Sequence, residues 1–193
     1  MTTVAGLATR QRLLGSAREL IETGGYGSAS VVAIAERTGV AAATLYRHFP
    51  SKEELFIEVF RDVCEGEERA MRAAAEEAGP GAVARLEAVL TTFARRALQN
   101  RSLAWALLAE PVDPLVDAER LAYRERYASL VAAELRAAIG AGEIPSQDVA
   151  FTAAALVGGC GEALVGPLAS MAGGEEVVGE IETFVRRAIG AAV

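Results

Sequence analysis

The side chains best suited to chemistry in this sequence lie close together, between residues 44 and 48. They are Thr44, Tyr46, Arg47 and His48, which offer hydroxyl groups, an aromatic ring, a guanidinium group and an imidazole, with no carboxylate among them. Groups of these kinds donate hydrogen bonds to phosphate oxygens and to the edges of bases. The chemistry that this cluster favours is therefore the binding of a nucleic acid.

Two short helical patterns would position this cluster. The first begins at Ser30, a good N-cap, and places apolar residues of 31–35 on one face. A turn at Gly39-Val40 joins it to a second, in which Leu45 and Phe49 stand at i and i+4 and both face inward. The polar side chains then face outward, as on the helix that a helix-turn-helix protein places in the major groove. Periodicity alone fits an ordinary helical hairpin with a polar surface equally well.

The segment TGVAAATLYRHFPSKEELF resembles the signature of the tetracycline-repressor (TetR) family of one-component regulators. The elements that match are Gly39-Val40, Thr44-Leu45-Tyr46, His48-Phe49, Ser51-Lys52 and the Glu-Glu-Leu that follows, within a similarity that covers residues 9 to 60. The resemblance implies an all-α, ligand-responsive transcriptional repressor. It also implies three partners, which are double-stranded operator DNA, a small-molecule effector and a second copy of the chain.

By this resemblance, Thr44, Tyr46, His48 and Lys52 take the DNA-contact positions of the family, and we add Ser30 to this set. Lys52 stands on the first turn of the next helix, where its charge and free backbone N–H groups both favour phosphate. Arg47 occupies a variable position and is the candidate for a guanine contact.

One stretch departs from the family pattern. The family often has a serine at the position of Ala41, whereas Ala41-Ala42-Ala43 leaves the start of this helix without a capping hydroxyl or a long donor. We therefore expect sequence discrimination to rest on Arg47, Tyr46 and Thr44, supplemented by DNA shape.

The charge of the chain is divided unevenly. The formal net charge of the 193 residues is −7, but residues 1–52 hold six basic and three acidic side chains, a net of +3, and the remainder carries −10. This division predicts attraction to phosphate in the N-terminal quarter and repulsion elsewhere.

Few residues suit catalysis or metal binding. His48 is the only histidine, too few for a di-iron bundle and without an obvious partner for a serine triad. Gly158–Gly161 lacks the strand and the GK[ST] of a phosphate loop, and we expect its glycines to allow close helix contact. Cys64 and Cys160 lie far apart and are interpreted as reduced core thiols. We expect no enzyme, no metal and no cofactor. The alternative is a helical small-molecule binding protein or an enzyme that does not bind DNA.

Composition and hydropathy predict a cytoplasmic protein. The longest apolar stretch, 149–174, is interrupted by Glu162 and rich in glycine, which argues against a membrane span. The N-terminal residues lack the apolar core of a signal peptide.

The expected domains are a helix-turn-helix DNA-binding domain over 1–52 and an effector-binding and dimerisation domain over 53–193. We expect residues 1–8 to be disordered, Gly24-Gly25 to end the first helix, and Ser51 and Ser146 to cap later ones. The expected helices cover residues 9–23, a segment from Ser30 to the turn at Gly39-Val40, a segment after that turn with Leu45 and Phe49, then 52–78, 82–98, a short segment around Trp105, 114–139, a segment after 146, and 175–189.

Two further sites are expected in the larger domain. Aromatic side chains and one thiol would line an apolar effector pocket that takes a small hydrophobic or aromatic molecule: Phe93, Trp105, Tyr123, Tyr127, Phe151 and Cys160. The last two long helices would form the homodimer interface, through Val157, Val177, Ile181, Phe184 and Ala188.

Overall fold

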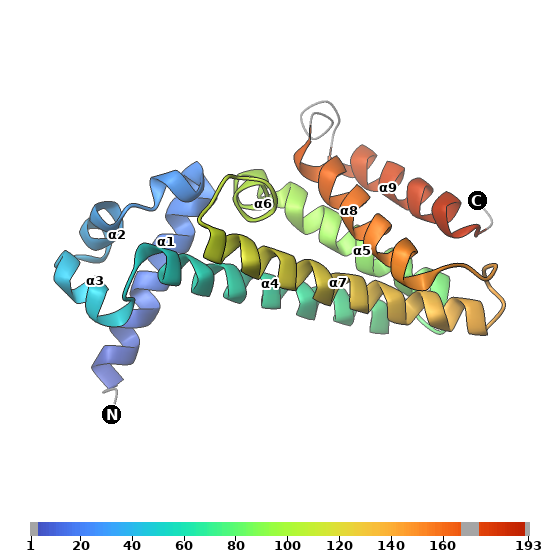
Figure 1. Ribbon diagram of the computed structural model, residues 1–193, viewed down its shortest axis with the longest axis horizontal. Helices are drawn as coiled ribbons and strands as arrows, with labels where there is room; N and C mark the ends of the chain where they lie inside the picture. Colours follow the sequence, from blue (N-terminus) through green and yellow to red (C-terminus); the bar gives the residue numbers. More distant parts are fainter. Residues whose placement is uncertain (1–3, 167–173, 192–193) are drawn as a thin grey trace. The chain divides into compact units, whose positions relative to one another are not determined.

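The computed structural model describes residues 4–166 and 174–191, which contain helices and no strand. The all-α prediction is confirmed. No helix in this described part is long and apolar enough to cross a bilayer. The helices, labelled in Figure 1, are α1 (Val4–Ser28), α2 (Val31–Thr38), α3 (Ala42–His48), α4 (Lys52–Glu77), α5 (Ala82–Gln99), α6 (Arg101–Leu108), α7 (Pro114–Gly140), α8 (Val149–Val165) and α9 (Gly174–Ile189).

The chain forms two compact units. The first runs to Val63 and adds Ser102–Arg120, and the second contains Cys64–Arg101 and the chain from Leu121 onward. Residues 102–120, which the sequence placed in the larger domain, thus belong to the same unit as the helix-turn-helix. The predicted division at residue 52 concerned function, and it stays a prediction.

Helix α1 begins earlier than predicted and is interrupted where the prediction ended it. It begins at Val4, so residues 4–8, expected to be disordered, are helical, while residues 1–3 of that expectation lie outside the described residues. Extending an existing helix adds one hydrogen bond per residue without a new nucleation cost, and the alanine and leucine of this segment favour it. At the other end Gly24 and Gly25 leave the helical conformation, as predicted, and Gly25 adopts φ 74° and ψ −177°. This break turns the chain into the short segment that carries Tyr26.

The two caps of the helix-turn-helix differ, as the sequence predicts. The hydroxyl of Ser30 accepts a hydrogen bond of 3.1 Å from the N–H of Ala33 at the start of α2. Gly39 ends α2 with φ 67°, a left-handed conformation that glycine adopts without strain. Ala41, at the N-cap of α3, makes no side-chain hydrogen bond. Helix α3 therefore starts without the stabilisation that α2 receives.

Helix α4 begins at the predicted cap. The Ser51 hydroxyl accepts a hydrogen bond of 3.2 Å from the N–H of Glu54. Leu55, Phe56 and Phe60 face inward and are nearly inaccessible to solvent, as the helical spacing predicts. The start of α4, which carries Lys52, is thereby fixed to the core of the first unit.

In the second unit α5 packs against both α8 and α9. The buried side of α9 carries Val177, Val178, Ile181, Val185 and Ile189. Helix α8 begins two residues later than predicted, because Asp148 rather than Ser146 is its N-cap and accepts a hydrogen bond of 3.0 Å from Phe151 N–H. The neighbouring Gln147 donates instead to the carbonyl of Ile189 at 3.1 Å, which fixes this loop against the end of α9.

Candidate nucleic-acid interface

Helix α3 presents the polar face that its sequence predicts. Leu45 and Phe49 are buried, while Tyr46 is 51% exposed and Arg47 is exposed. Thr44 and His48 are half-buried on either side of them. The apolar side of α3 thus anchors it in the unit and leaves hydroxyl, aromatic and cationic groups on the outside.

Arg47 differs from the arginines of α1 and α2. Three of those are held in ion pairs, Arg10 with Glu58, Arg18 with Glu22 and Asp62, and Arg37 with Glu19. Arg12 donates to the carbonyl of Thr38. Arg47 makes neither an ion pair nor a hydrogen bond within residues 4–166 and 174–191. The guanidinium group of α3 is therefore available for an external acceptor.

Lys52, the only lysine among the 19 basic residues of the chain, is held at the start of α4. Its ammonium group donates to the carbonyl of Tyr26 at 3.2 Å and lies 3.9 Å above the centre of the Tyr26 ring. That ring also packs against Phe56 in a T-shaped arrangement, with the centroids 4.3 Å apart. Burial lowers the pKa of Lys52. An ammonium group has three N–H donors, so two remain for a phosphate.

Glu110, which follows α6, takes part in this arrangement and was not found from the sequence. Its Oε2 accepts a hydrogen bond of 2.8 Å from the backbone N–H of Tyr26. A Cβ atom at Gly25 would lie 2.9 Å from that same oxygen, so glycine allows the carboxylate to approach. Arg120 is 8% exposed and donates to the carbonyls of Leu107 at 2.8 Å and Glu110 at 2.9 Å. No local pattern marks this contact, because 84 positions separate Glu110 from Tyr26.

Three of the six predicted effector residues come together. In the second unit, the ring centroids of Phe93 and Tyr127 are 5.8 Å apart, and those of Tyr123 and Tyr127 are 6.1 Å apart. The hydroxyl of Tyr127 donates to the carbonyl of Cys64 at 3.2 Å, and burial raises the pKa of Tyr127. Cys160 is buried on α8, where burial raises the pKa of its thiol to about 12.

The other two aromatic candidates lie elsewhere. Trp105 belongs to the first unit and is 46% exposed, and Phe151 on α8 is 73% exposed. Neither is enclosed in the core of the chain as the Tyr123 and Tyr127 rings are. The predicted role of these six residues in binding an effector stays a prediction.

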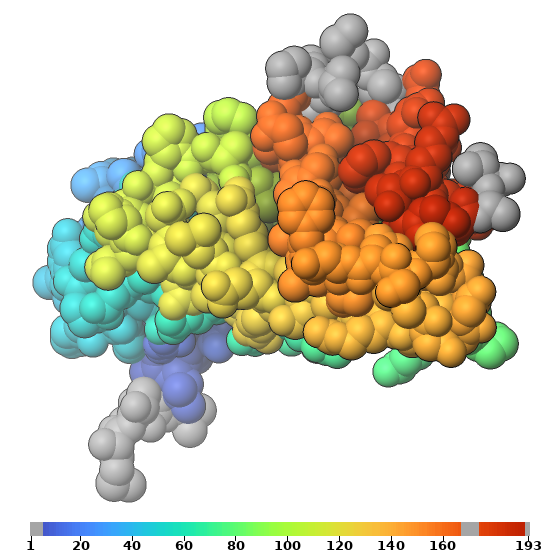
Figure 2. Space-filling view, turned by 45° about the vertical axis from the view of Figure 1, so that its right-hand side comes forward, coloured from blue at the N-terminus to red at the C-terminus, as the bar shows by residue number. Residues whose placement is uncertain are grey.

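The predicted dimer residues differ in their exposure to solvent. Val177 and Ile181 are buried within their own chain, Val157 is half-buried, and Phe184 and Ala188 are exposed. Figure 2 shows the outer surface where α8 (orange) and α9 (red) lie side by side. A Cβ atom at Gly159 of α8 would lie 3.3 Å from the ring of Phe184, so the expected close helix contact at these glycines is confirmed there.

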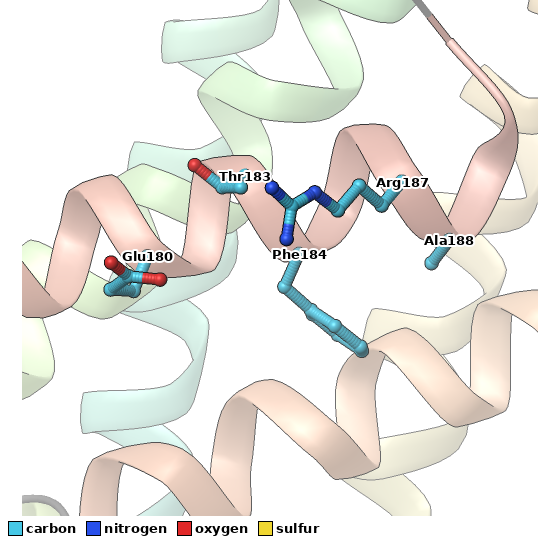
Figure 3. Close-up of a pocket in the computed structure, with 5 residues that line it drawn as sticks. All are labelled: Glu180, Thr183, Phe184, Arg187 and Ala188. Atoms are coloured by element: carbon cyan, nitrogen blue, oxygen red, sulfur yellow. The ribbon is translucent and has the colours of Figure 1, made fainter. Parts of the chain in front are cut away.

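An open hollow lies on the outside of α9 beside Phe184. It measures about 390 Å³, and Figure 3 shows the five residues around it: Glu180, Thr183, Phe184, Arg187 and Ala188. All of them stand on one helix, and the hollow is a surface depression rather than an enclosed chamber. None of the six residues predicted for the effector pocket lines this hollow.

Within residues 4–166 and 174–191, no three His, Cys, Asp or Glu side chains gather as ligands of one ion. Cys64 and Cys160 are both buried free thiols. The ionisable groups around α3 and the start of α4 thus suit hydrogen bonding to an external anion better than metal coordination.

Comparison with known proteins gives consistent matches. Residues 13–59 match the family model described as bacterial regulatory proteins, tetR family. Over 152 residues the chain is 31% identical to the HTH-type transcriptional regulator UidR of Escherichia coli (strain K12), a match that covers 77% of this chain and 76% of that protein. A match of 48 residues, 46% identical, joins it to the HTH-type transcriptional repressor KstR of Rhodococcus jostii (strain RHA1), covering 25% of this chain and 23% of that protein.

Solved structures show the same fold. The regulator FadR from Bacillus subtilis, in complex with stearoyl-CoA, has a TM-score of 0.77 at 21% identity, over 95% of this chain and 99% of that one. The fatty acid degradation regulator FadR from Bacillus halodurans has a TM-score of 0.80 at 17% identity, over 95% and 97% of the two chains. At these identities the likeness shows the fold alone.

Proposed function

This chain belongs to the TetR family of bacterial regulatory proteins, and from that premise we propose that it is a homodimeric repressor released from its operator by a small-molecule effector. It is a transcriptional regulator and not an enzyme. The helix-turn-helix of α2 and α3 binds the operator. The larger helical part carries the effector site and the dimer interface, and the protein works in the cytoplasm.

One observation carries the DNA-binding part of the proposal. The outer face of α3 presents Tyr46 and the unpaired Arg47, and the adjacent start of α4 holds the ammonium group of Lys52. In this proposal Arg47 reads a guanine, since a guanidinium group matches its two acceptors. Lys52 binds phosphate, and Thr44, His48 and Ser30 contribute further backbone contacts.

The experiment is a salt titration of operator binding. DNA upstream of the chain's own gene serves as the specific site, and the same bases in scrambled order serve as the non-specific one. Lys52→Ala should weaken binding to both DNAs and reduce the slope of log affinity against log salt by about one unit per subunit. Arg47→Ala should cost about 1–3 kcal/mol on the operator alone and relax the preference at one base pair in each half-site.

Arg37→Ala is the matched control, since it removes an arginine charge that Glu19 already neutralises at 2.7 Å. We expect it to change the salt slope less than Lys52→Ala does. Equal losses on both DNAs for Arg47→Ala would reduce that arginine to a phosphate contact. Binding to neither DNA by the wild type would favour a helical small-molecule binding protein without DNA binding.

The exposed apolar face of α8 and α9 supports the proposed dimer. Phe151 is 73% exposed and Phe184 is 44% exposed, and small residues of α8 are exposed between them in sequence. Aromatic side chains of this size dominate the energetics of many interfaces when buried. Val177 and Ile181 support this face from their own core, so Phe184 is the residue to substitute.

The cluster of Phe93, Tyr123 and Tyr127 supports an effector site in the second unit. Its apolar rings and the phenolic groups suit a hydrophobic or aromatic molecule. Such an effector must bind better to the arrangement that does not bind DNA, and a coupling of about 1–3 kcal/mol would weaken operator binding about 5- to 150-fold. Because a FadR of the same fold was solved with stearoyl-CoA, a long-chain acyl-CoA is a reasonable first probe. If neither it nor a broad metabolite screen shifts operator affinity, the hypothesis of an inducible repressor loses its support.

A further inference from the structure

We propose that Glu110 is a positioning residue for DNA binding, which fixes the Tyr26 segment and through it holds the ammonium group of Lys52 ready for a phosphate. This inference rests on the proposed function, because Lys52 must contact DNA. All of the residues involved belong to the first unit.

The first step is the contact between Glu110 and the segment that follows the break at Gly24 and Gly25 in α1. Gly25 adopts φ 74°, which points the chain out of the helix, and the next N–H, that of Tyr26, donates to Glu110 Oε2 at 2.8 Å. A hydrogen bond to a carboxylate is about twice as strong as one between neutral groups. Glu110 thus fixes the backbone of Tyr26.

The second step leads from Tyr26 to Lys52. The Tyr26 carbonyl accepts from the Lys52 ammonium group at 3.2 Å, and the Tyr26 ring lies 3.9 Å below the same nitrogen. Phe56 packs against the same ring in a T-shaped arrangement. Two independent contacts to one residue therefore determine where the lysine nitrogen lies.

The third step explains why Glu110 itself stays in place. Arg120 donates to the Glu110 carbonyl at 2.9 Å and to the Leu107 carbonyl at 2.8 Å, and it pairs with Asp117 at 3.0 Å. The last carbonyls of a helix have no hydrogen-bond donors within the helix, and Arg120 provides such donors at the end of α6. Glu110 is thus anchored through its backbone, which leaves its carboxylate to hold Tyr26.

The charge of Glu110 has a second effect on Lys52. Burial lowers the pKa of this lysine, whereas the negative charges of Glu53 and Glu110 raise it. Removing the Glu110 carboxylate should therefore leave the ammonium group less firmly positioned and should lower the pKa of Lys52. If the Lys52 side chain must become ordered only when DNA binds, this ordering costs about 0.5–1.5 kcal/mol of binding free energy, which lowers the affinity about two- to twelvefold for each subunit.

The experiment compares four single variants and one double variant of the full chain. Glu110→Ala removes the acceptor, and Glu110→Gln keeps an acceptor of similar shape without the charge. Glu119→Gln is the control, since it removes one negative charge from the same unit, where Glu119 pairs with Arg61. Lys52→Met, alone and combined with Glu110→Ala, closes a double-mutant cycle. Thermal unfolding of each variant tests whether it is folded.

The first readout needs no DNA. Reductive methylation with ¹³C places a label on Lys52 as the only lysine of the chain, and NMR then follows its shift and its pKa. We expect Glu110→Ala and Glu110→Gln to move the Lys52 signal toward its position in the unfolded protein and to lower the lysine pKa. Glu119→Gln should leave the signal in place.

The second readout is operator affinity as a function of salt. Glu110→Ala should weaken binding about two- to twelvefold per subunit, and Glu110→Gln should fall between it and the wild type. If the Glu110 carboxylate had no positioning role, Glu110→Ala should instead strengthen operator binding, because removing a negative charge reduces the repulsion of DNA. In the Lys52→Met background, Glu110→Ala should cause no further loss.

Three results would overturn the inference. One is an unchanged Lys52 signal in both Glu110 variants, and another is operator binding by Glu110→Ala as tight as that of Glu119→Gln. The third is a loss of operator affinity on Glu110→Ala that is as large in the Lys52→Met background as in the wild type, which would make Glu110 a structural residue. If the wild type binds no DNA at low salt, the proposed function fails and this inference fails with it.

Discussion

The substitution Ala41→Ser should stabilise the recognition helix. Ala41 is exposed at the N-cap of α3 with φ −70° and ψ 147°, and it makes no side-chain hydrogen bond. Ser30 has nearly the same backbone at the N-cap of α2, φ −71° and ψ 154°, and its hydroxyl accepts from the N–H three residues on. Because the two caps share their φ and ψ angles, the hydroxyl that Ala41→Ser introduces should reach the N–H of Thr44 without any movement of the chain. It would share this donor with the carbonyl of residue 41, which accepts from Thr44 N–H at 2.8 Å.

The magnitude follows from that comparison. Exchange between serine and alanine at an N-cap changes stability by about 1 kcal/mol. For a chain of this length the midpoint of thermal unfolding should rise by about 2–4 °C. Ser30→Ala should lower it by a similar amount, and the double variant should return close to the wild type because the two hydroxyls share no partner.

The assay is thermal unfolding followed by circular dichroism, with hydrogen exchange of the Thr44 amide as the local readout. Slower exchange at Thr44 in Ala41→Ser would place the gain at α3. The reasoning would be refuted if Ser30→Ala lowers the midpoint as expected while Ala41→Ser leaves it unchanged or lowers it. Equal backbone geometry would then not be sufficient for capping.

Three further predictions concern the second unit. Phe184→Glu should turn a dimer into a monomer in light scattering at micromolar concentration. Leu115→Glu, on an apolar residue of the first unit that is more exposed than Phe184, should leave the mass unchanged, and a monomeric wild type would contradict the proposed dimer. Burial raises the pKa of Glu87 despite its pair with Arg186, so the folded state binds this proton more tightly than the unfolded state does. The free energy of unfolding of the wild type minus that of Glu87→Gln should therefore fall as pH rises above the ordinary glutamate range, and a rising difference would refute the sign. Tyr127→Phe removes the buried hydroxyl that donates at 3.2 Å and should cost about 1 kcal/mol in urea unfolding, where no loss would mean that this hydrogen bond contributes nothing net.

Local signals predicted most of the helices. The glycines that interrupt α1, the serines at 30 and 51, and the apolar spacing of α4 each act through their immediate neighbours, so a short stretch of sequence is enough to predict their effect. The start of α8 was missed because Ser146 and Asp148 are both good caps. The choice between them depends on Gln147, which reaches the end of α9. A sequence window cannot contain that contact.

The candidate sites were predicted less completely for two reasons. The apolar residues of α9 form one continuous stripe that contains both the buried Ile181 and the exposed Phe184, so periodicity could not separate the part of the stripe that the chain buries from the part that it leaves exposed. The contact between Glu110 and Tyr26 joins residues 84 positions apart, and a single glutamate after a helix has no local signature. Arg47 and Lys52, in contrast, were marked by residue type and spacing alone.

The left-handed glycine at position 25 has a consequence for the evolution of related chains. A side chain there would meet both the strain of φ 74° and the Glu110 carboxylate, 2.9 Å from the new Cβ. The backbone conformation requires glycine at position 25 whatever residue stands at 110, whereas the Glu110 carboxylate can approach Tyr26 N–H only while position 25 has no Cβ. Relatives that lose Gly25 should therefore also lose Glu110, whereas Glu110 can be lost while Gly25 is kept, although one position belongs to the DNA-binding helices and the other follows α6.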